Sequence, residues 1–72
     1  MNEKIEFSSR LRQAMTDAGY AASPSVLEHE FNLRWYGRSI SNQAAWSWLN
    51  SKAIPTQEKI QVLAEWLKVA PE

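Results

Sequence analysis

The chain has 72 residues and contains no cysteine. A disulfide framework and a thiolate zinc site are therefore both excluded. Histidine is almost as scarce: His29 is the only one, flanked by Glu28 and Glu30, and no second ligand stands at metal-binding spacing from it. We expect His29 to lie on the surface, and we predict no metal site and no cofactor.

Glycine is also rare, with two residues in the whole chain, so the sequence has no glycine-rich loop that could cradle phosphates. It also lacks a cysteine nucleophile, a second histidine and an evident pair of carboxylates in a cleft. The sequence therefore predicts that the protein is not an enzyme.

Long apolar runs are absent as well. No stretch approaches the roughly 20 apolar residues that a membrane-spanning helix needs. The first ten residues, MNEKIEFSSR, lack the apolar stretch of a secretory signal. We expect a soluble, cytoplasmic protein without a membrane partner, and the lack of cysteine suits a reducing compartment.

Eight basic and eight acidic side chains give a formal net charge of zero, which argues against indiscriminate binding to nucleic acid. The distribution of these charges is uneven. Between Phe31 and Gln57 the only charged residues are Arg34, Arg38 and Lys52. This basic region predicts phosphate binding of modest strength, because each neutralised phosphate adds about one unit to the slope of log K against log salt.

Four segments with helical spacing of apolar residues predict an all-α fold, a compact bundle of four to five helices in a single domain over residues 1–72. The first helix should run from about residue 8 to residue 18, with Gly19 as its left-handed cap. The second should have Ser23 as N-cap and Pro24 at its first position, and should end near residue 33 or 35.

The third helix should begin after Ser39 or Ser41 and end near Ser51, so that it covers about residues 41–51. The fourth should have Thr56 as N-cap and end near Lys68. The residues that these two helices turn inward are predicted by their spacing to be Ala45, Trp48, Leu49, Ile60, Leu63, Ala64 and Leu67.

The outer face of the third helix carries amides and hydroxyls where Glu and Lys are the usual occupants. Its residues are Asn42, Gln43, Trp46, Ser47 and Asn50. Amides and hydroxyls form the hydrogen bonds that read base edges. Alternatively, Asn42 and Gln43 have no role in binding, and serve only as a cap at the N-terminus of the helix and a solvated amide beside that cap. We expect Trp46 to pack over the turn before this helix, with stacking on DNA or a protein interface as the alternatives.

The fourth helix has a second apolar line, formed by Val62, Trp66 and Val69, next to its core stripe. A domain of this size cannot easily cover both lines. Either the second line packs on the N-terminal segment around Ile5, or it is an exposed patch that makes the protein a homodimer.

The order of these motifs resembles that of the lambda-repressor-like, or XRE, family of helix-turn-helix domains. The matching residues are Phe7, Leu11, Ala18 and Gly19 around the first helix, Ser41 and Trp48 in the third, and Pro55, Leu63, Ala64, Leu67 and Val69 around the fourth. The resemblance covers nearly the whole chain. It implies sequence-specific binding of double-stranded DNA, as in a transcriptional regulator of bacterial or phage type, with the third helix in the major groove.

The resemblance also implies roles for individual residues. By position, the base contacts fall on Asn42, Gln43 and Ser47. The phosphate contacts fall on Ser41, Asn50, Lys52, Arg34 and Arg38, although Arg34 is as easily an ordinary exposed side chain. Because few charges are available, we expect a homodimer on a two-fold operator, with Val62, Trp66 and Val69 as its possible interface.

Three features depart from the family pattern. Residues 33–39, LRWYGRS, lengthen the turn before the third helix. They either extend the second helix or project Arg34, Trp35, Tyr36 and Arg38 towards the DNA backbone around Gly37. We expect part helix and part loop, with at least one of Trp35 and Tyr36 packed as core. Ser51 replaces the glycine that usually follows the third helix, which would move the left-handed cap to Asn50. Many members have a buried ion pair between the first and third helices, and at the matching positions this chain has Met15 and Leu49. Arg10 and Arg12 are then free to lie elsewhere, for instance along the surface or against Asp17 or Glu28.

A different class of function also fits the sequence. A protein-interaction module, such as an adaptor or an antitoxin-like bundle, would explain the neutral charge and the four tryptophans. Exposed tryptophan is enriched at the energetic centres of protein interfaces. Under this hypothesis, substitutions of Trp46 or Trp66 would abolish binding and substitutions of the basic residues would not.

Overall fold

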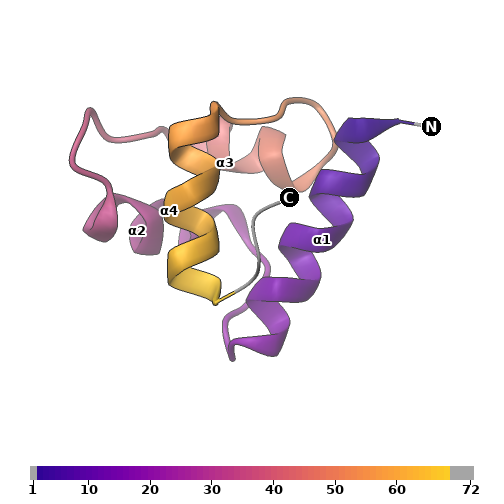
Figure 1. Cartoon of the computed structure of the whole chain (residues 1–72), viewed down its shortest axis with the longest axis horizontal. Helices are drawn as coiled ribbons and strands as arrows, with labels where there is room; N and C mark the ends of the chain where they lie inside the picture. The colour runs from indigo at the N-terminus through magenta and orange to yellow at the C-terminus, as the bar shows by residue number, and fades with distance from the viewer. Residues whose placement is uncertain (1, 69–72) are drawn as a thin grey trace.

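The structure is a computed structural model in which residues 2–68 are described. This part of the chain forms four helices and no strand: α1 (Glu3–Asp17), α2 (Pro24–Arg34), α3 (Asn42–Leu49) and α4 (Gln57–Leu67). Figure 1 shows α4 in front of the bundle, with α2 on one side and α1 on the other. α3 packs against both α1 and α2, and α4 packs against α2. The all-α prediction and the number of helices are confirmed.

α1 begins at Glu3, five residues earlier than the sequence predicted. The side chain of Asn2 caps this end, because its Oδ1 accepts hydrogen bonds from the backbone N–H groups of Lys4 and Ile5, at 2.9 and 3.3 Å. Glu3 and Glu6 stabilise the first turn through the helix dipole. At the other end Gly19 has φ +90°, the left-handed conformation predicted for it.

The other helix ends follow the sequence closely. Ser23 caps α2 by accepting a hydrogen bond from the N–H of Val26 at 3.3 Å, and Pro24 occupies the first turn. Ser41 caps α3 in the same way through the N–H of Ala44, at 3.1 Å. Thr56 is the N-cap residue of α4, but its hydroxyl makes no capping hydrogen bond.

Side chains from all four helices form one apolar core. The largest fully buried members are Met15, Leu27, Phe31 and Leu49. The ring of Trp48 meets that of Phe31 edge to face, with 5.4 Å between the centroids. This contact joins α3 to α2, and it fixes which face of α3 is left toward solvent.

The second apolar line of α4 is covered by Tyr20, which lies in the loop after α1. Trp66 is 8% exposed, and its ring packs edge to face on Tyr20 at 5.1 Å. Ile5, which was expected to cover this line, is 55% exposed. Val62 is partly buried against the same core, and Val69 lies outside the described residues. None of the helices over residues 2–68 has the length and apolar character required to span a membrane.

Candidate functional site

The outward face of α3 is polar and exposed, as its spacing predicted. Asn42 and Gln43 are exposed and Ser47 is half-buried, while Ala45, Trp48 and Leu49 on the opposite side are buried. Among residues 2–68, no hydrogen bond engages the side chains of Asn42, Gln43 or Ser47. All three side chains named as base contacts therefore lie on one surface, and their hydrogen-bond donors and acceptors are unused.

Trp46 lies on this same face and is 44% exposed. The sequence suggested that its indole would pack over the turn before α3. That turn is instead packed by Trp35, and no aromatic or cationic side chain of the described residues stacks on Trp46. The indole is thus part of the outward surface of α3.

Asn32 of α2 holds the chain immediately before α3. Its Oδ1 accepts a hydrogen bond from the N–H of Ile40 at 2.9 Å, and its Nδ2 donates to the carbonyl oxygen of Ile40 at 3.2 Å. Both backbone groups of Ile40 are thereby paired, and its side chain is 7% exposed. This clamp fixes the N-terminal end of α3 relative to α2.

The C-terminal end of α3 is closed partly by its own chain. An eight-residue helix leaves its last four carbonyl groups without helical partners. The carbonyl of Trp46 accepts from Asn50 Nδ2 at 2.9 Å, and that of Ser47 accepts from the N–H groups of Lys52 and Ala53 at 3.0 and 3.3 Å. Two of the four carbonyls are satisfied in this way.

α1 supplies the partners of the other two. Ser8 Oγ donates to the carbonyl of Trp48, and Arg12 Nε donates to that of Leu49, at 2.7 and 2.8 Å. Ser8 is 3% exposed, and its Oγ also accepts a hydrogen bond from the N–H of Ser51 at 2.7 Å. Since Arg12 is a cation at the negative end of the helix dipole, its bond also stabilises α3 electrostatically.

These contacts bear on two expectations. Arg12 is exposed, as expected, but it binds the last turn of α3 and not an acidic side chain, and its Nη2 also reaches Asn50 Oδ1 at 3.2 Å. The left-handed residue after α3 is Ser51, with φ +63°, whereas Asn50 has φ −119°. The apolar pair that replaces the family's ion pair is in place, because Met15 and Leu49 are both buried in the core.

The lengthened turn is part helix and part loop, as predicted. α2 continues to Arg34, and a loop follows until Ser41. Trp35 packs on the core with its ring 5.7 Å from that of Phe31, whereas Tyr36 is 81% exposed and touches only the ring of Trp35 among the described aromatic residues, at 4.6 Å. The expectation that one of the two aromatic residues belongs to the core is met by Trp35.

Four of the five residues named as phosphate contacts fall into two groups. Arg34 Nη1 pairs with Glu30 Oε1 at 2.9 Å, and its guanidinium lies 5.1 Å from the centre of the Trp66 ring. Asn50 is held by its bonds to Trp46 and Arg12. Arg38 and Lys52 are exposed, and neither has an ion pair within residues 2–68.

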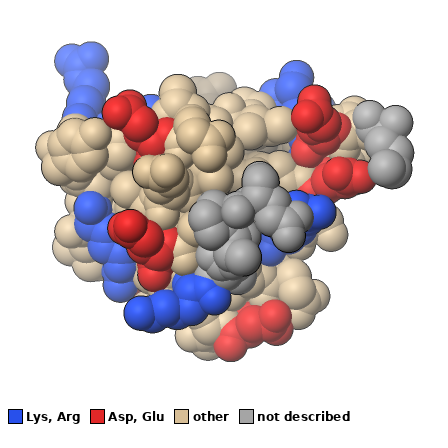
Figure 2. Space-filling model, in the orientation of Figure 1, with Lys and Arg blue, Asp and Glu red and all other residues tan. Residues whose placement is uncertain are grey.

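Ser41 uses its hydroxyl oxygen as the N-cap of α3, which leaves the proton of that hydroxyl as a donor. The sequence did not predict one cation near the loop. Lys59 of α4 places its Nζ 5.8 Å from the centre of the Trp35 ring. Its proximity depends on the packing of α4, so no local sequence signal could have revealed it. The surface charge is mixed, and Figure 2 shows acidic and basic groups interspersed over the face that carries α4.

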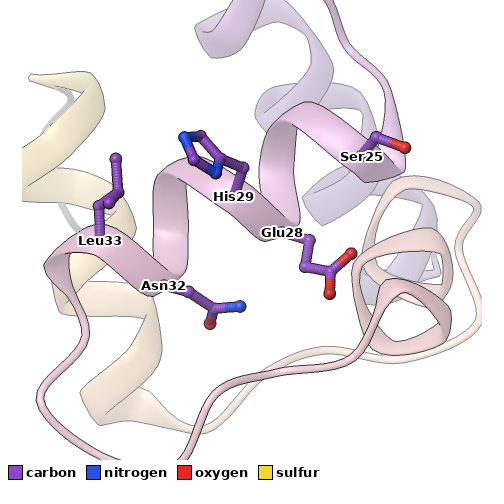
Figure 3. A pocket seen from close by; sticks show the side chains of 5 residues that line it. All are labelled: Ser25, Glu28, His29, Asn32 and Leu33. Carbon is purple, nitrogen blue, oxygen red and sulfur yellow. The ribbon is translucent and has the colours of Figure 1, made fainter.

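The outer surface of α2 has a shallow, open depression of about 400 Å³. It is lined by five residues of that helix, Ser25, Glu28, His29, Asn32 and Leu33, and Figure 3 shows His29 and Asn32 pointing to different sides of the helix. His29 is exposed, as predicted, and Asn32 is already engaged with Ile40. No group of three metal-binding side chains occurs in the part of the chain described. The depression therefore has no evident chemistry of its own.

No protein-family model, no curated protein and no solved structure matches this chain. The resemblance to the lambda-repressor-like family thus depends on the motifs of the sequence. What the outward face of α3 can do is argued below from its own side chains.

Proposed function

We propose that the protein binds double-stranded DNA in a sequence-specific manner, with α3 in the major groove, as a transcriptional regulator of bacterial or phage type. The observation that carries the proposal is that α3 is held at both ends while the hydrogen-bonding side chains on its outward face are unused. A helix positioned in this way can present its side chains to a ligand with little loss of conformational entropy on binding.

The base contacts are assigned to Asn42, Gln43 and Ser47. An amide can bind adenine in a bidentate arrangement, in which its NH₂ group donates to N7 and its carbonyl oxygen accepts from the N6 amino group, and a serine hydroxyl can pair with several bases. Asn42 and Gln43 occupy the N-terminal part of α3, which is the part of a recognition helix that reaches base edges in helix-turn-helix proteins.

The phosphate contacts are assigned to Arg38, Lys52 and the hydroxyl of Ser41, which lie on either side of α3 along the chain. Arg34 and Asn50, which the sequence also suggested, take a supporting role, because their side chains already bind Glu30, Trp46 and Arg12. Two cations give a modest affinity per protomer. Two protomers on a two-fold operator would multiply that affinity.

We do not assign the homodimer contact to Val62 and Trp66, which the sequence suggested as part of a possible interface. Trp66 is 8% exposed and Val62 is partly buried, so little of either side chain is left for a partner. A dimer that forms on DNA would need only the spacing of its half-sites to bring two protomers together.

The exposure of Trp46 favours a second candidate, a protein-interaction surface on the same face of α3. An indole that is 44% exposed on a helix without charged residues is typical of an interface centre. The two candidates differ in their response to salt, since DNA binding weakens steeply as salt rises and an apolar protein contact does not.

Selection of binding sites from a randomised duplex library tests the proposal. We expect the wild-type protein to enrich a defined sequence, and a variant with Asn42→Ala and Gln43→Ala to lose that enrichment while still binding DNA weakly. Gln61→Ala is the matched control, because Gln61 is an exposed amide on α4. Enrichment that is unchanged in the Asn42 and Gln43 variant would exclude this face as the reader of bases.

A further inference from the structure

We infer that residues 35–39, which we call the aromatic loop, form a second DNA-contacting element, in which Tyr36 and Arg38 bind the sugar–phosphate backbone beside the groove that α3 enters. This inference rests on the proposed function and adds to it a contact that reads no bases. Its basis is that the loop is firmly held from inside and yet presents an aromatic and a cationic side chain to solvent.

The loop is fixed at its beginning by Trp35. The indole packs on Phe31, with 5.7 Å between ring centroids, and the ammonium of Lys59 lies 5.8 Å from its ring centre. It is fixed at its end by the two hydrogen bonds between Asn32 and Ile40. The seven residues between α2 and α3 are thereby anchored at both ends.

Gly37 completes this arrangement at the tip of the loop. A Cβ atom at this position would lie 2.8 Å from Trp35 Nε1, closer than such contacts occur in proteins, and 3.0 Å from Trp35 Cε2. The backbone of Gly37 therefore lies directly against the indole, and a larger residue here would require the ring or the loop to shift. The residues on either side of it, Tyr36 and Arg38, are carried on a supported backbone.

The side chain of Tyr36 makes few contacts within the protein. Its side chain is 81% exposed, and its one aromatic contact among residues 2–68 is with the ring of Trp35, at 4.6 Å. An exposed tyrosine held on another ring is a rigid, amphipathic group that can bury its face and donate from its hydroxyl at little cost in entropy. Arg38, two residues on, is exposed without an ion-pair partner in the described part of the chain.

The charge of the surrounding chain favours a polyanion as the ligand. No acidic residue occurs between Glu30 and Glu58, a stretch that holds the whole aromatic loop and all of α3. The loop leads directly into Ser41 at the N-terminus of α3, so a duplex with its groove at that end has its backbone close to the loop. The Arg38 guanidinium would donate to a phosphate, and the Tyr36 ring would pack on a deoxyribose.

The test uses the full chain, the DNA sequence that it selects and a scrambled duplex. Tyr36→Ala and Arg38→Gln are compared with Ile5→Ala and Lys68→Gln, which change an exposed apolar and an exposed cationic residue outside the loop and α3. We expect each loop variant to raise Kd about tenfold on both duplexes, so that the ratio of the two Kd values is unchanged. Arg38→Gln should also lower the slope of log K against log salt by about one.

Hydroxyl-radical footprinting reports the contact directly. We expect the wild-type protein to protect the sugars that flank the α3 site. Tyr36→Ala should lose the protection of these flanking sugars and keep the protection at the α3 site. Its thermal unfolding curve should be unchanged, because Tyr36 is so exposed. Wild-type affinity and footprint in both loop variants would overturn the inference, together with the phosphate contact assigned to Arg38, and leave base reading by α3 standing. A loss confined to the selected sequence would also overturn it, because Tyr36 and Arg38 would then read bases. No binding to either duplex by the wild-type protein would overturn both proposals.

Discussion

The hydroxyl of Ser8 lies 2.7 Å from the carbonyl oxygen of Trp48, forty residues further along the chain, and it accepts the N–H of Ser51 at the same distance. One buried side chain of α1 thus satisfies a backbone acceptor and a backbone donor at the end of α3. We expect Ser8→Ala to leave both groups buried without partners and to lower the free energy of unfolding by about 1–3 kcal/mol.

Urea unfolding followed by circular dichroism measures this loss. Ser9→Ala is the matched control, because Ser9 is the next residue of α1 and is exposed. We expect the control to change the free energy of unfolding by no more than about 0.5 kcal/mol. Equal stabilities for the two variants would show that the Ser8 bonds do not hold α3.

The two amides Asn32 and Asn42 should respond to alanine in opposite ways. Asn32→Ala removes both bonds to Ile40, so we expect it to lower the free energy of unfolding by about 1–3 kcal/mol and to weaken DNA binding through the released loop. Asn42→Ala touches no intramolecular bond within residues 2–68, and we expect unchanged unfolding with a loss of sequence preference. Thermal unfolding and binding isotherms of both variants make the comparison, and a stability loss in Asn42→Ala would contradict it.

Gly37→Ala should displace the indole of Trp35. The added Cβ would lie 2.8 Å from Trp35 Nε1, so the ring or the loop must move. We expect a loss of about 1–3 kcal/mol in the free energy of unfolding, as for other overpacked sites. Ser39→Ala is the control, since Ser39 is an exposed residue of the same turn. A variant as stable as the wild type would show that the loop does not depend on the contact between Gly37 and Trp35.

Trp46 should report DNA binding through its fluorescence. It is the most exposed of the four tryptophans, because Trp48 and Trp66 are buried and Trp35 is half-buried. We expect the selected duplex to quench the tryptophan emission of the wild-type protein and to have little effect on that of Trp46→Phe. Quenching of the same size in both proteins would place Trp46 away from the DNA.

Local chemistry explains which parts of the fold could be predicted. Gly19 and Ser23 act through backbone groups a few residues away, so their positions in the sequence were enough to place the end of α1 and the start of α2. Ser41 acts in the same way and was one of two candidates for the start of α3. Asn2 carries the same kind of signal, an asparagine followed by acidic residues, and the start of α1 could have been found from it.

The contacts that hold α3 could not be found in this way. Ser8 and Arg12 meet residues 37 to 43 positions away, and periodicity assigns a residue to a face of its helix without naming its partner on another. The outward surface of α3 was predictable because the buried positions of Ala45, Trp48 and Leu49 leave its other side to solvent. The pairing of Tyr20 with Trp66 was not, because a loop residue that folds back on the core carries no sequence signal for its partner.

Binding of a fluorescently labelled random-sequence duplex, followed by anisotropy at about 50 mM and about 200 mM salt, tests the central claim most directly. The wild-type protein is compared with a variant carrying Arg38→Ala and Lys52→Ala, two exposed changes that should leave the fold intact. We expect binding at micromolar protein that weakens with salt, and a slope of log K against log salt that falls by about two in the variant. Absence of binding by the wild-type protein at low salt would contradict DNA binding by α3, and would favour a protein partner at Trp46.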